Sequence, residues 1–293
     1  MSSHAAPKNV LTIPKVQKKK VLGEKITMVT CYDATFAKLV DAAGIDLVLV
    51  GDSLGMVIQG QKNTLPVTLN DMIYHTAAVS RGLSNPVIIA DMPFMSYQAE
   101  FGVALKNAGT LMKKGNAHSV KIEGGMEVAE LAYRMSRVGI PVMGHIGLEP
   151  QKVHSYGGFK VRGKALSEER KLIKDAKALE EAGCWSLVIE GVPSEVADKI
   201  TQAVTIPTIG IGSGPGCDGQ VLVLYDLLGL DPSFKPKFVK KYVDLATVVT
   251  DALKSYVDEV KTKQFPADEH QFHRLALVTP LKKKVHDCFF NTF

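Results

Sequence analysis

The segment "IDLVLVGDSLG", from Ile45 to Gly55, decides the fold class of this 293-residue chain. Residues 47–50 are all apolar, and the run is short. Such a run is typical of a strand that is buried on both faces of a parallel sheet. Asp52 and Ser53 follow it directly. Two polar side chains are therefore expected at the carboxyl end of this strand.

The same pattern recurs along the chain, with helix-like segments between the apolar runs. The other seven strands are expected in "ITMVT" (26–30), "PVIIADM" (86–92), "HSVKIEGG" (118–125), "IPVMGHIG" (140–147), "WSLVIEGV" (185–192), "IPTIGIG" (206–212) and "VLVLYD" (221–226). Eight buried strands that alternate with helices favour a closed α/β barrel, the (β/α)8 TIM barrel, over an open doubly wound sheet. The chain length fits, because such barrels take about 250 residues.

Composition and charge predict the domain organisation. We expect a basic lead-in over residues 1–20, the barrel over residues 21–265 and a C-terminal tail over residues 266–293. Much of the net charge of +5 lies in two lysine runs, at residues 18–20 and 282–284. No nucleic-acid-binding motif accompanies them, so we expect solvated tails and no nucleic-acid partner.

The cysteines and the apolar runs predict the cellular compartment. Cys31, Cys184, Cys217 and Cys288 lack metal-binding spacing, which fits a reducing cytosol. No apolar run reaches the roughly 18 residues of a membrane span. The first residues also lack the apolar core of a signal peptide. We therefore expect a soluble, cytoplasmic protein with no membrane partner.

Ionisable side chains follow five of the predicted strands. They are Asp52, Asp91, Lys121 with Glu123, His145 and Glu190. In a barrel, catalytic groups come from the carboxyl ends of several strands, so these side chains are expected at one mouth. Each one alone could be a helix cap or a solvated turn residue. Five together favour an active site.

The acids among these residues indicate a metal. Asp52, Asp91 and Glu123 supply the hard oxygen ligands that Mg²⁺ prefers. Without a cation, three carboxylates in one cleft would repel one another. Lys121 points to the same side of its strand as Glu123. It could neutralise an anionic substrate beside the metal or form a Schiff base, and the neighbouring acids favour the first role.

Ser53 also fits a competing pattern, because "GDSLG" matches the Gly-x-Ser-x-Gly motif of hydrolase nucleophiles. That motif needs a late triad histidine, and GDSL esterases use an Asp-x-x-His pair. No histidine in the chain has an aspartate three residues before it. The segment after Ser53 holds glycines and a proline rather than a clean helix. The sequence therefore favours chemistry at Asp52 over a serine nucleophile.

Two glycine-rich segments leave alternatives open. "GIGSGPG" (210–216) lacks the spacing of a dinucleotide fingerprint. It could contact an anion or cosubstrate, or be a flexible loop that needs positive φ angles. "HSYGGFKVRGK" (154–164) could be a lid over the site or an insertion that makes subunit contacts.

Several stretches together resemble the ketopantoate hydroxymethyltransferase family, within the barrel superfamily of phosphoenolpyruvate mutase and isocitrate lyase. They are "TCYDATFAKLVDAAGIDLVLVGDSLGMVIQG" (30–60), "TLPVTLNDMIYHTAAVSRG" (64–82), "DMPFMSYQ" (91–98), "SVKIEGG" (119–125), "GIPVMGHIGLEPQ" (139–151) and "IPTIGIGSGPGCDGQVLVLYDLLGL" (206–230). The motifs follow the family order, and the resemblance runs from about Ile26 to Phe272.

The resemblance implies the first step of pantothenate synthesis. A hydroxymethyl group passes from 5,10-methylenetetrahydrofolate to 3-methyl-2-oxobutanoate and gives 2-dehydropantoate. It also implies site residues: Asp52, Asp91 and Glu123 for one Mg²⁺ per subunit, Ser53 and Lys121 for contacts to the keto acid, Glu190 as general base, and His145 in the pocket. Glu190 at the end of an apolar strand fits a buried base, or a salt-bridged acid.

The resemblance further implies a ring-built homo-oligomer, a decamer. The tail from His273 to Phe293 lies outside the resemblance and could be a subunit contact, a disordered end or a sequence anomaly. It touches no motif, so it bears on oligomerisation rather than on activity. Two alternatives are a related magnesium-dependent lyase or mutase and a catalytically inactive barrel that serves as a scaffold. The chain lacks the "KKCGH"-like loop of those lyases, and every expected acid is present.

Overall fold

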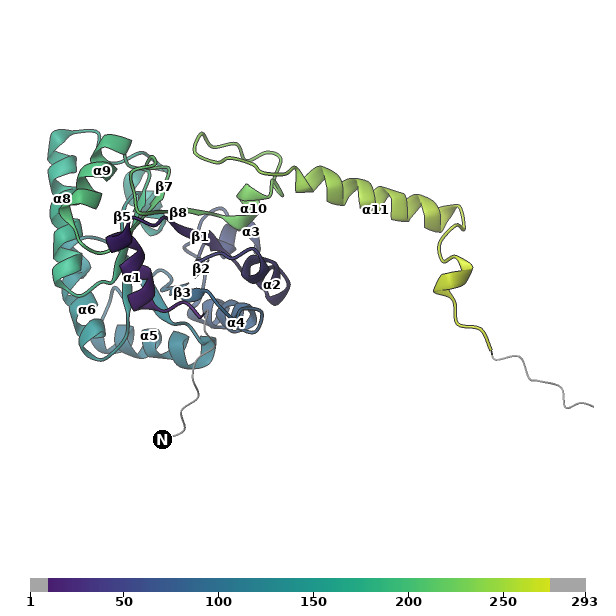
Figure 1. Ribbon diagram of the computed structural model, residues 1–293, viewed down its shortest axis with the longest axis horizontal. Coiled ribbons are helices and arrows are strands. Elements are labelled where there is room, and N and C mark those ends of the chain that lie inside the picture. Colours follow the sequence, from purple (N-terminus) through teal and green to yellow (C-terminus); the bar gives the residue numbers. More distant parts are fainter. Residues whose placement is uncertain (1–9, 275–293) are drawn as a thin grey trace, which may run out of the picture. The chain divides into compact units, whose positions relative to one another are not determined.

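A computed structural model describes residues 10–274, in which eight strands close a parallel barrel (Figure 1). The strands are β1 Ile26–Thr30, β2 Leu47–Val50, β3 Val87–Asp91, β4 Ser119–Glu123, β5 Val142–Gly147, β6 Ser186–Glu190, β7 Thr208–Ile211 and β8 Gly219–Leu222. β8 pairs with β1 as well as with β7, so the sheet has no free edge. The predicted (β/α)8 barrel is confirmed.

Helices surround the barrel and link most of its strands (Figure 1). The helices of the described residues are α1 Ile13–Leu22, α2 Ala34–Ala42, α3 Leu54–Val57, α4 Leu69–Ser80, α5 Phe101–Gly115, α6 Met126–Arg137, α7 Val153–Tyr156, α8 Leu166–Glu181, α9 Ser194–Ala203, α10 Leu224–Leu227 and α11 Leu245–Lys261, with 3-10 turns η1 Pro150–Lys152 and η2 Asp268–His270; nearly all of α11 and η2 belong to a second compact unit. None of the helices within residues 10–274 is both long and apolar enough to span a membrane.

Local signals in the sequence start several of these helices. The carboxylate of Asp33 caps α2 by accepting hydrogen bonds from the backbone N–H groups of Thr35 and Phe36. Thr68 and Asp71 form a reciprocal capping box at the start of α4. Such caps satisfy backbone donors that lack a partner in the first helical turn. They fix where the chain leaves a loop and enters a helix.

The alternation of side chains divides the core into two layers. Outward-facing strand residues such as Val48, Ile88 and Val120 pack against the surrounding helices. Inward-facing residues such as Leu47 and Ile89 fill the barrel interior. Both faces of the strands are thus buried, which explains why the strands read as continuous apolar runs.

Helix α1 belongs to the folded unit. Val16 is fully buried and packs with the residues of the barrel interior. Lys19 pairs with Asp46 at 2.6 Å, and Lys20 pairs with Asp218 at 3.0 Å. The expectation of a solvated basic tail is therefore wrong for Lys19 and Lys20. The second lysine run, at residues 282–284, lies outside the described residues.

The last two strands differ from the sequence expectation. β7 and β8 are joined by residues 212–218 without a helix. β8 begins two residues earlier than predicted and ends at Leu222, after which Leu224–Leu227 form α10. The backbone N–H of Leu224 donates to Thr30 Oγ1, so the chain turns there instead of continuing as a strand.

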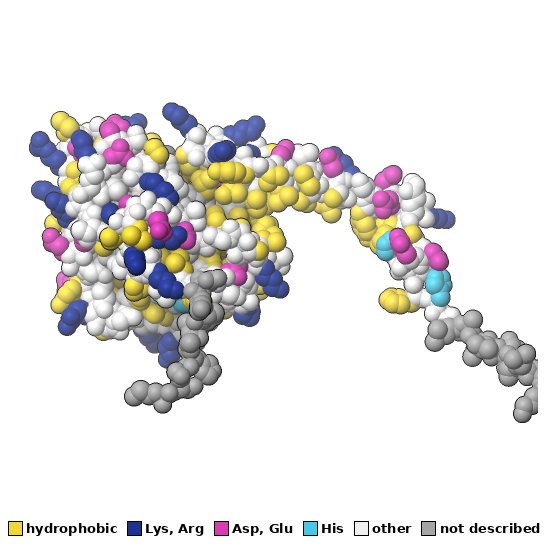
Figure 2. Space-filling view, in the orientation of Figure 1, with side chains coloured by type: hydrophobic (Ala, Val, Ile, Leu, Met, Phe, Trp, Pro, Cys, Tyr) yellow, Lys and Arg dark blue, Asp and Glu magenta, His cyan; other side chains and the backbone are white. Residues whose placement is uncertain are grey.

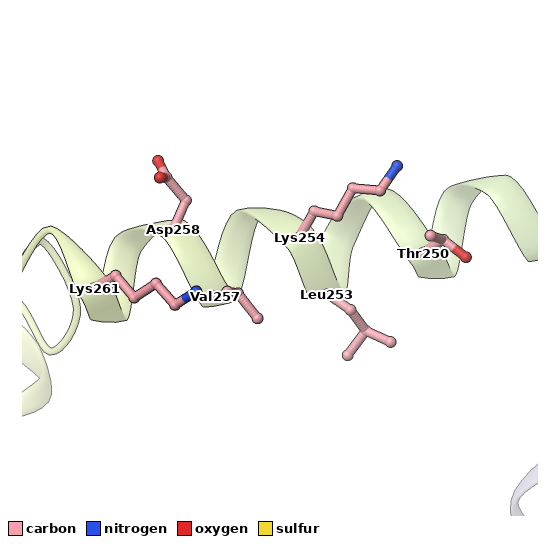
Figure 3. Close-up of a pocket in the computed structure, with 6 residues that line it drawn as sticks. All are labelled: Thr250, Leu253, Lys254, Val257, Asp258 and Lys261. Carbon is pink, nitrogen blue, oxygen red and sulfur yellow. The ribbon is translucent and has the colours of Figure 1, made fainter.

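The described chain divides into two compact units, residues 10–245 and residues 246–274. In the second unit, α11 has no buried residue. Leu253 and Val257 project from one side of this helix, whereas Lys254 and Asp258 project from the other (Figure 3). Hydrophobic side chains line the helix in the space-filling view (Figure 2). The boundaries predicted at residues 20 and 265 stay predictions.

Candidate active site

The period-two alternation of the strands aims the predicted residues into the barrel mouth. Asp91 follows the inward-facing Ile89 by two positions, and Glu190 follows Val188 in the same way. Since side chains two apart share a face, Asp91 and Glu190 point inward, whereas Asp52 lies beyond the end of β2 and is placed by the turn after it. Lys121, Glu123 and His145 lie at corresponding positions of β4 and β5. The site therefore occupies the arc of the mouth from β2 to β6.

Each of the three predicted metal-binding acids has one oxygen held by an N–H donor. Asp52 Oδ2 accepts from Gln151 Nε2 at 2.9 Å, and Glu123 Oε2 accepts from the Gln151 backbone N–H at 3.0 Å. Asp91 Oδ2 accepts from the backbone N–H of Asp52 at 3.0 Å. The other oxygens of Asp91 and Glu123 are buried and have no directed hydrogen bond.

Lys121 is the cation among these acids. Its Nζ lies 3.1 Å from Asp91 Oδ1 and 4.0 Å from Glu123 Oε1. Burial by itself would lower the pKa of Lys121, but the carboxylates of Asp91, Glu123 and Asp52 outweigh it and raise this pKa. Lys121 is therefore an ammonium ion at neutral pH, which disfavours the Schiff-base role.

The carboxylates carry more negative charge than Lys121 can offset. Burial, followed by repulsion from Asp91, raises the pKa of Asp52 to about 7. Burial also raises the pKa of Glu123 well above its ordinary value. Such shifts report the cost of holding several buried anions together. A divalent cation would remove this cost.

The donor set fits such a cation. The acids offer hard oxygens, and Asp91 Oδ1 and Glu123 Oε1 face the Lys121 ammonium rather than a backbone or amide N–H donor. Within residues 10–274, no three histidine, cysteine, aspartate or glutamate side chains already converge at coordination distance. Because Lys121 Nζ lies within 4.0 Å of both acids, it holds part of this space. Binding would need small shifts of these side chains.

His145 links Lys121 to Glu190. His145 Nδ1 lies 3.1 Å from Lys121 Nζ, and its Nε2 lies 3.2 Å from Glu190 Oε2. Since the Lys121 ammonium is a donor only, Nδ1 must accept. The proton of the neutral ring is then on Nε2, which faces the Glu190 carboxylate. The two side chains are in contact, but the geometry is not that of a directed hydrogen bond.

Ser53 has the surroundings of a hydrogen-bonding group. Its Oγ lies 2.9 Å from the hydroxyl of Tyr32, which follows β1 and is buried. No histidine within residues 10–274 hydrogen-bonds to Ser53, so a serine–histidine pair is missing from this part of the chain. The predicted preference for Asp52 over a serine nucleophile agrees with this geometry.

Two residues hold the end of β6 that carries Glu190. The Ser213 hydroxyl, in the loop after β7, donates to the Ile189 carbonyl at 2.8 Å and accepts from the Val192 N–H at 3.2 Å. Gly147 faces Glu190 across the β5–β6 ladder. Its φ is +100°, and an added Cβ would collide with the Glu190 carbonyl oxygen and lie 2.7 Å from Val192 Cγ2.

We predict that Gly147→Ala lowers the free energy of unfolding by about 2–4 kcal/mol, because the left-handed backbone strain and the steric clash add. The matched control is Gly109→Ala in α5, where an added Cβ meets nothing within 4 Å. That substitution should raise stability by up to about 1 kcal/mol. Urea titrations of both variants measure the difference. Equal stability of the two would contradict the packing argument.

The two glycine-rich loops lie beside the mouth. Gly212 and Gly214 have φ angles of +61° and +78°, so the 210–216 loop does need glycine. A cavity of about 450 Å³ opens beside the loop after β5, and its lining includes Glu149 and Tyr156. The Tyr156 hydroxyl donates to Glu149 Oε1 at 2.9 Å. The anion contact, the lid and the subunit contact stay predictions.

Sequence reasoning missed the residues that support the site. Gln151, Tyr97 and Tyr32 are uncharged and lie in loops or just beyond a strand end. Their contacts join segments far apart in the chain; Gln151, for example, is 99 positions from Asp52. A polar loop residue has no periodicity, so no local signal marks it. All three fall within family motifs, which was the available signal.

Comparisons with known proteins agree with the motifs. The family model described as ketopantoate hydroxymethyltransferase matches residues 10–268. A 3-methyl-2-oxobutanoate hydroxymethyltransferase from Anaeromyxobacter sp. (strain Fw109-5) is 53% identical over 277 residues, which cover 93% of this chain and 91% of the relative. A protein of the same name from Syntrophus aciditrophicus (strain SB) is 51% identical over 93% of this chain and 100% of its own length.

Solved structures share the fold at low identity. The crystal structure of 2,3-dimethylmalate lyase, a member of the PEP mutase/isocitrate lyase superfamily, aligns with a TM-score of 0.57 at 15% identity, over 92% of this chain and 91% of that one. Phosphonopyruvate hydrolase in complex with oxalate and Mg²⁺ aligns with a TM-score of 0.57 at 10% identity, over 89% of this chain and 93% of that one. These structures support the barrel fold.

Proposed function

The chain belongs to the ketopantoate hydroxymethyltransferase family, and from this premise we propose a mechanism in which Mg²⁺ and 5,10-methylenetetrahydrofolate serve hydroxymethyl transfer to 3-methyl-2-oxobutanoate. Relatives of about 50% identity are named 3-methyl-2-oxobutanoate hydroxymethyltransferase, so the chain is a hydroxymethyltransferase of pantothenate biosynthesis. One observation supports the mechanism most: Asp52, Asp91 and Glu123 are buried together at the barrel mouth, next to Lys121. Glu190 lies at the same mouth, with its Oε2 3.2 Å from His145 Nε2.

We assign the cation to Asp52, Asp91 and Glu123. When bound, one Mg²⁺ per subunit supplies Lewis-acid stabilisation of negative charge on the substrate oxygens. The charge excess of the acids and their unbonded oxygens support this assignment. A structure with the same fold, phosphonopyruvate hydrolase, contains Mg²⁺ and oxalate. That likeness supports the fold and is compatible with a metal at the mouth.

Lys121 and Ser53 bind the keto acid in this proposal. The Lys121 ammonium can offset the charge of the substrate carboxylate, and it is held by Asp91 at 3.1 Å. The Ser53 hydroxyl can donate to a substrate oxygen while it accepts from Tyr32. Both groups are fixed before the substrate arrives, which lowers the cost of orienting it.

Glu190 is the general base. The hydrogen on C3 of 3-methyl-2-oxobutanoate is next to a ketone, so a carboxylate can remove it when the developing charge is stabilised. The C3–H bond breaks, the proton moves to Glu190, and the electron pair passes to the keto oxygen. C3 then bonds to the methylene carbon of the folate while one of its two C–N bonds breaks, and the freed nitrogen takes up the proton that C3 lost. Water displaces the second folate nitrogen from this carbon, and the proton that water loses goes to that nitrogen, so the hydroxymethyl product and tetrahydrofolate are released. His145 lies beside the Glu190 carboxylate.

We also propose a homo-oligomer, the decamer that the resemblance implies. Supporting it, α11 exposes Val248, Leu253, Tyr256, Val257 and Val260, each at least 43% exposed within the described residues. A contiguous apolar surface of this kind marks a protein contact. We place the enzyme in the cytoplasm, with small molecules as its other partners.

The function is tested by an assay with purified protein. With Mg²⁺, methylenetetrahydrofolate and 3-methyl-2-oxobutanoate, we expect 2-dehydropantoate, detected by mass spectrometry. Removal of the metal with EDTA and gel filtration should lower the rate at least about 100-fold, since Lewis-acid stabilisation contributes several kcal/mol. Excess Mg²⁺ should restore it. Full turnover by metal-free protein would contradict the proposed role of the metal. Absence of product from folded, metal-loaded protein would contradict the proposed reaction.

A further inference from the structure

We propose that Gln151 is a positioning residue that presents the carboxylates of Asp52 and Glu123 to the divalent cation. The inference rests on the proposed magnesium site. Gln151 ends no strand and is uncharged, so it has no part in the chemistry itself. It lies in η1, the turn that follows β5, and it is buried. From there it contacts residues that follow β2 and β3, and the last residue of β4.

Gln151 holds two acids through two different donors. Its side-chain Nε2 donates to Asp52 Oδ2 at 2.9 Å and to the Met92 carbonyl at 3.0 Å. Its backbone N–H donates to Glu123 Oε2 at 3.0 Å. One residue therefore fixes an oxygen of each acid.

The orientation of the Gln151 amide is determined by its partners. Its Oε1 accepts from the Tyr97 hydroxyl at 3.0 Å and from Gln98 Nε2 at 3.0 Å. The amide nitrogen faces two acceptors, and the amide oxygen faces Tyr97 and the Gln98 amide nitrogen, so a flipped amide would place its oxygen against two acceptors and its nitrogen against the Gln98 donor. A carboxylate at this position would place an oxygen against Asp52 and Met92. An apolar side chain would leave these buried groups unpaired.

This anchoring matters because a carboxylate can rotate and can use either oxygen. Fixing Asp52 Oδ2 restricts that rotation, and it directs the second oxygen of Asp52 away from Gln151. At Glu123 the same arrangement leaves Oε1 without a hydrogen bond. Partners that orient metal-binding side chains typically contribute 10–100-fold to metal affinity. Gln151 has the contacts for such a role.

The test measures Mn²⁺ binding to the full chain by electron paramagnetic resonance, without substrates. Gln151→Met keeps the length of the side chain but removes its donors, and we expect at least tenfold weaker binding. The matched control is Gln98→Met, which removes one hydrogen bond to Gln151 Oε1 and touches none of the acids. Its Mn²⁺ affinity should stay within about twofold of the unmodified protein, because Tyr97 still donates to Oε1.

Each outcome decides the question. Unchanged Mn²⁺ affinity in Gln151→Met, beside normal binding by the unmodified protein, would overturn the role of Gln151 and leave the magnesium site standing. A purely structural role would lower the urea midpoint of Gln151→Met while its folded fraction binds Mn²⁺ normally, and this too would overturn the proposal. If the unmodified protein binds no Mn²⁺, the proposed magnesium site is wrong, and the proposed role of Gln151 is wrong with it. If Gln151→Met does not fold, Gln151→Asn is the second variant. Its side chain keeps the amide but is too short to reach Asp52, so Mn²⁺ binding should again be at least tenfold weaker.

Discussion

Replacing Asp52 with asparagine should lower the rate of 2-dehydropantoate formation at least about a thousandfold. Asparagine keeps the size of the side chain and an oxygen that can accept from Gln151 Nε2. It removes the negative charge that we assign to cation binding. A loss of about 4 kcal/mol of transition-state stabilisation corresponds to a thousandfold in rate, and Lewis-acid catalysis contributes several kcal/mol.

The same substitution should stabilise the metal-free protein at pH 8. Burial and repulsion from Asp91 raise the pKa of Asp52 from 3.8 to about 7 in the folded chain. A carboxyl group with a raised pKa binds its proton more tightly in the folded than in the unfolded state. Its ionisation therefore destabilises the fold as pH rises from about 4 to about 7. Asparagine does not ionise, so its urea midpoint should exceed that of the unmodified protein.

Asp33→Asn is the matched control for Asp52→Asn. Asp33 also follows a strand at the catalytic end of the barrel, but it caps α2. Asparagine caps helices as well as aspartate does, so activity should stay within about twofold. Product formation is measured for both variants over a range of Mg²⁺ concentrations. If Asp52→Asn kept the full rate, the assignment of Asp52 to the metal would be wrong.

Glu190→Gln should abolish exchange of the C3 hydrogen of 3-methyl-2-oxobutanoate with solvent. A positioned general base contributes about 10²–10⁴-fold, so exchange should fall by at least about 100-fold. Glutamine can keep a contact with His145 Nε2 through its amide oxygen, which limits structural change. Exchange is followed by proton NMR in D₂O with Mg²⁺ and without folate, which isolates the proton-transfer step.

Two measurements make the result specific to the base. Mn²⁺ affinity of Glu190→Gln should stay within about threefold, because Glu190 is not assigned to the cation. The matched control is Glu195→Gln, an acid in the first turn of the helix after the same strand, and exchange should not change. Exchange at the normal rate in Glu190→Gln would exclude this residue as the base. A parallel loss of Mn²⁺ binding would assign it to the metal instead.

The barrel was predictable from the sequence because each strand is apolar on both faces. Runs such as residues 47–50 and 87–90 have no polar face, so they must lie between the barrel interior and a layer of helices. Where the pattern weakened, the prediction failed. Residues 212–218 replace an expected helix, and Gly219 and Gln220 start β8 in place of Val221. A segment that begins with a glycine and an exposed glutamine lacks the continuous apolar pattern of a buried strand.

The sequence by itself determined the barrel and the charged residues at its mouth. Strand alternation and the order of the strands are local properties, and they place Asp91, Glu123 and Glu190 at one end of the barrel. Only the tertiary structure decided what surrounds the side chains at the mouth: Gln151 donates to Asp52, Tyr32 pairs with Ser53, and His145 lies 3.2 Å from Glu190. These contacts join residues between 21 and 99 positions apart. Hydrogen bonds over such separations depend on where the closed barrel brings its loops, and no local pattern records that.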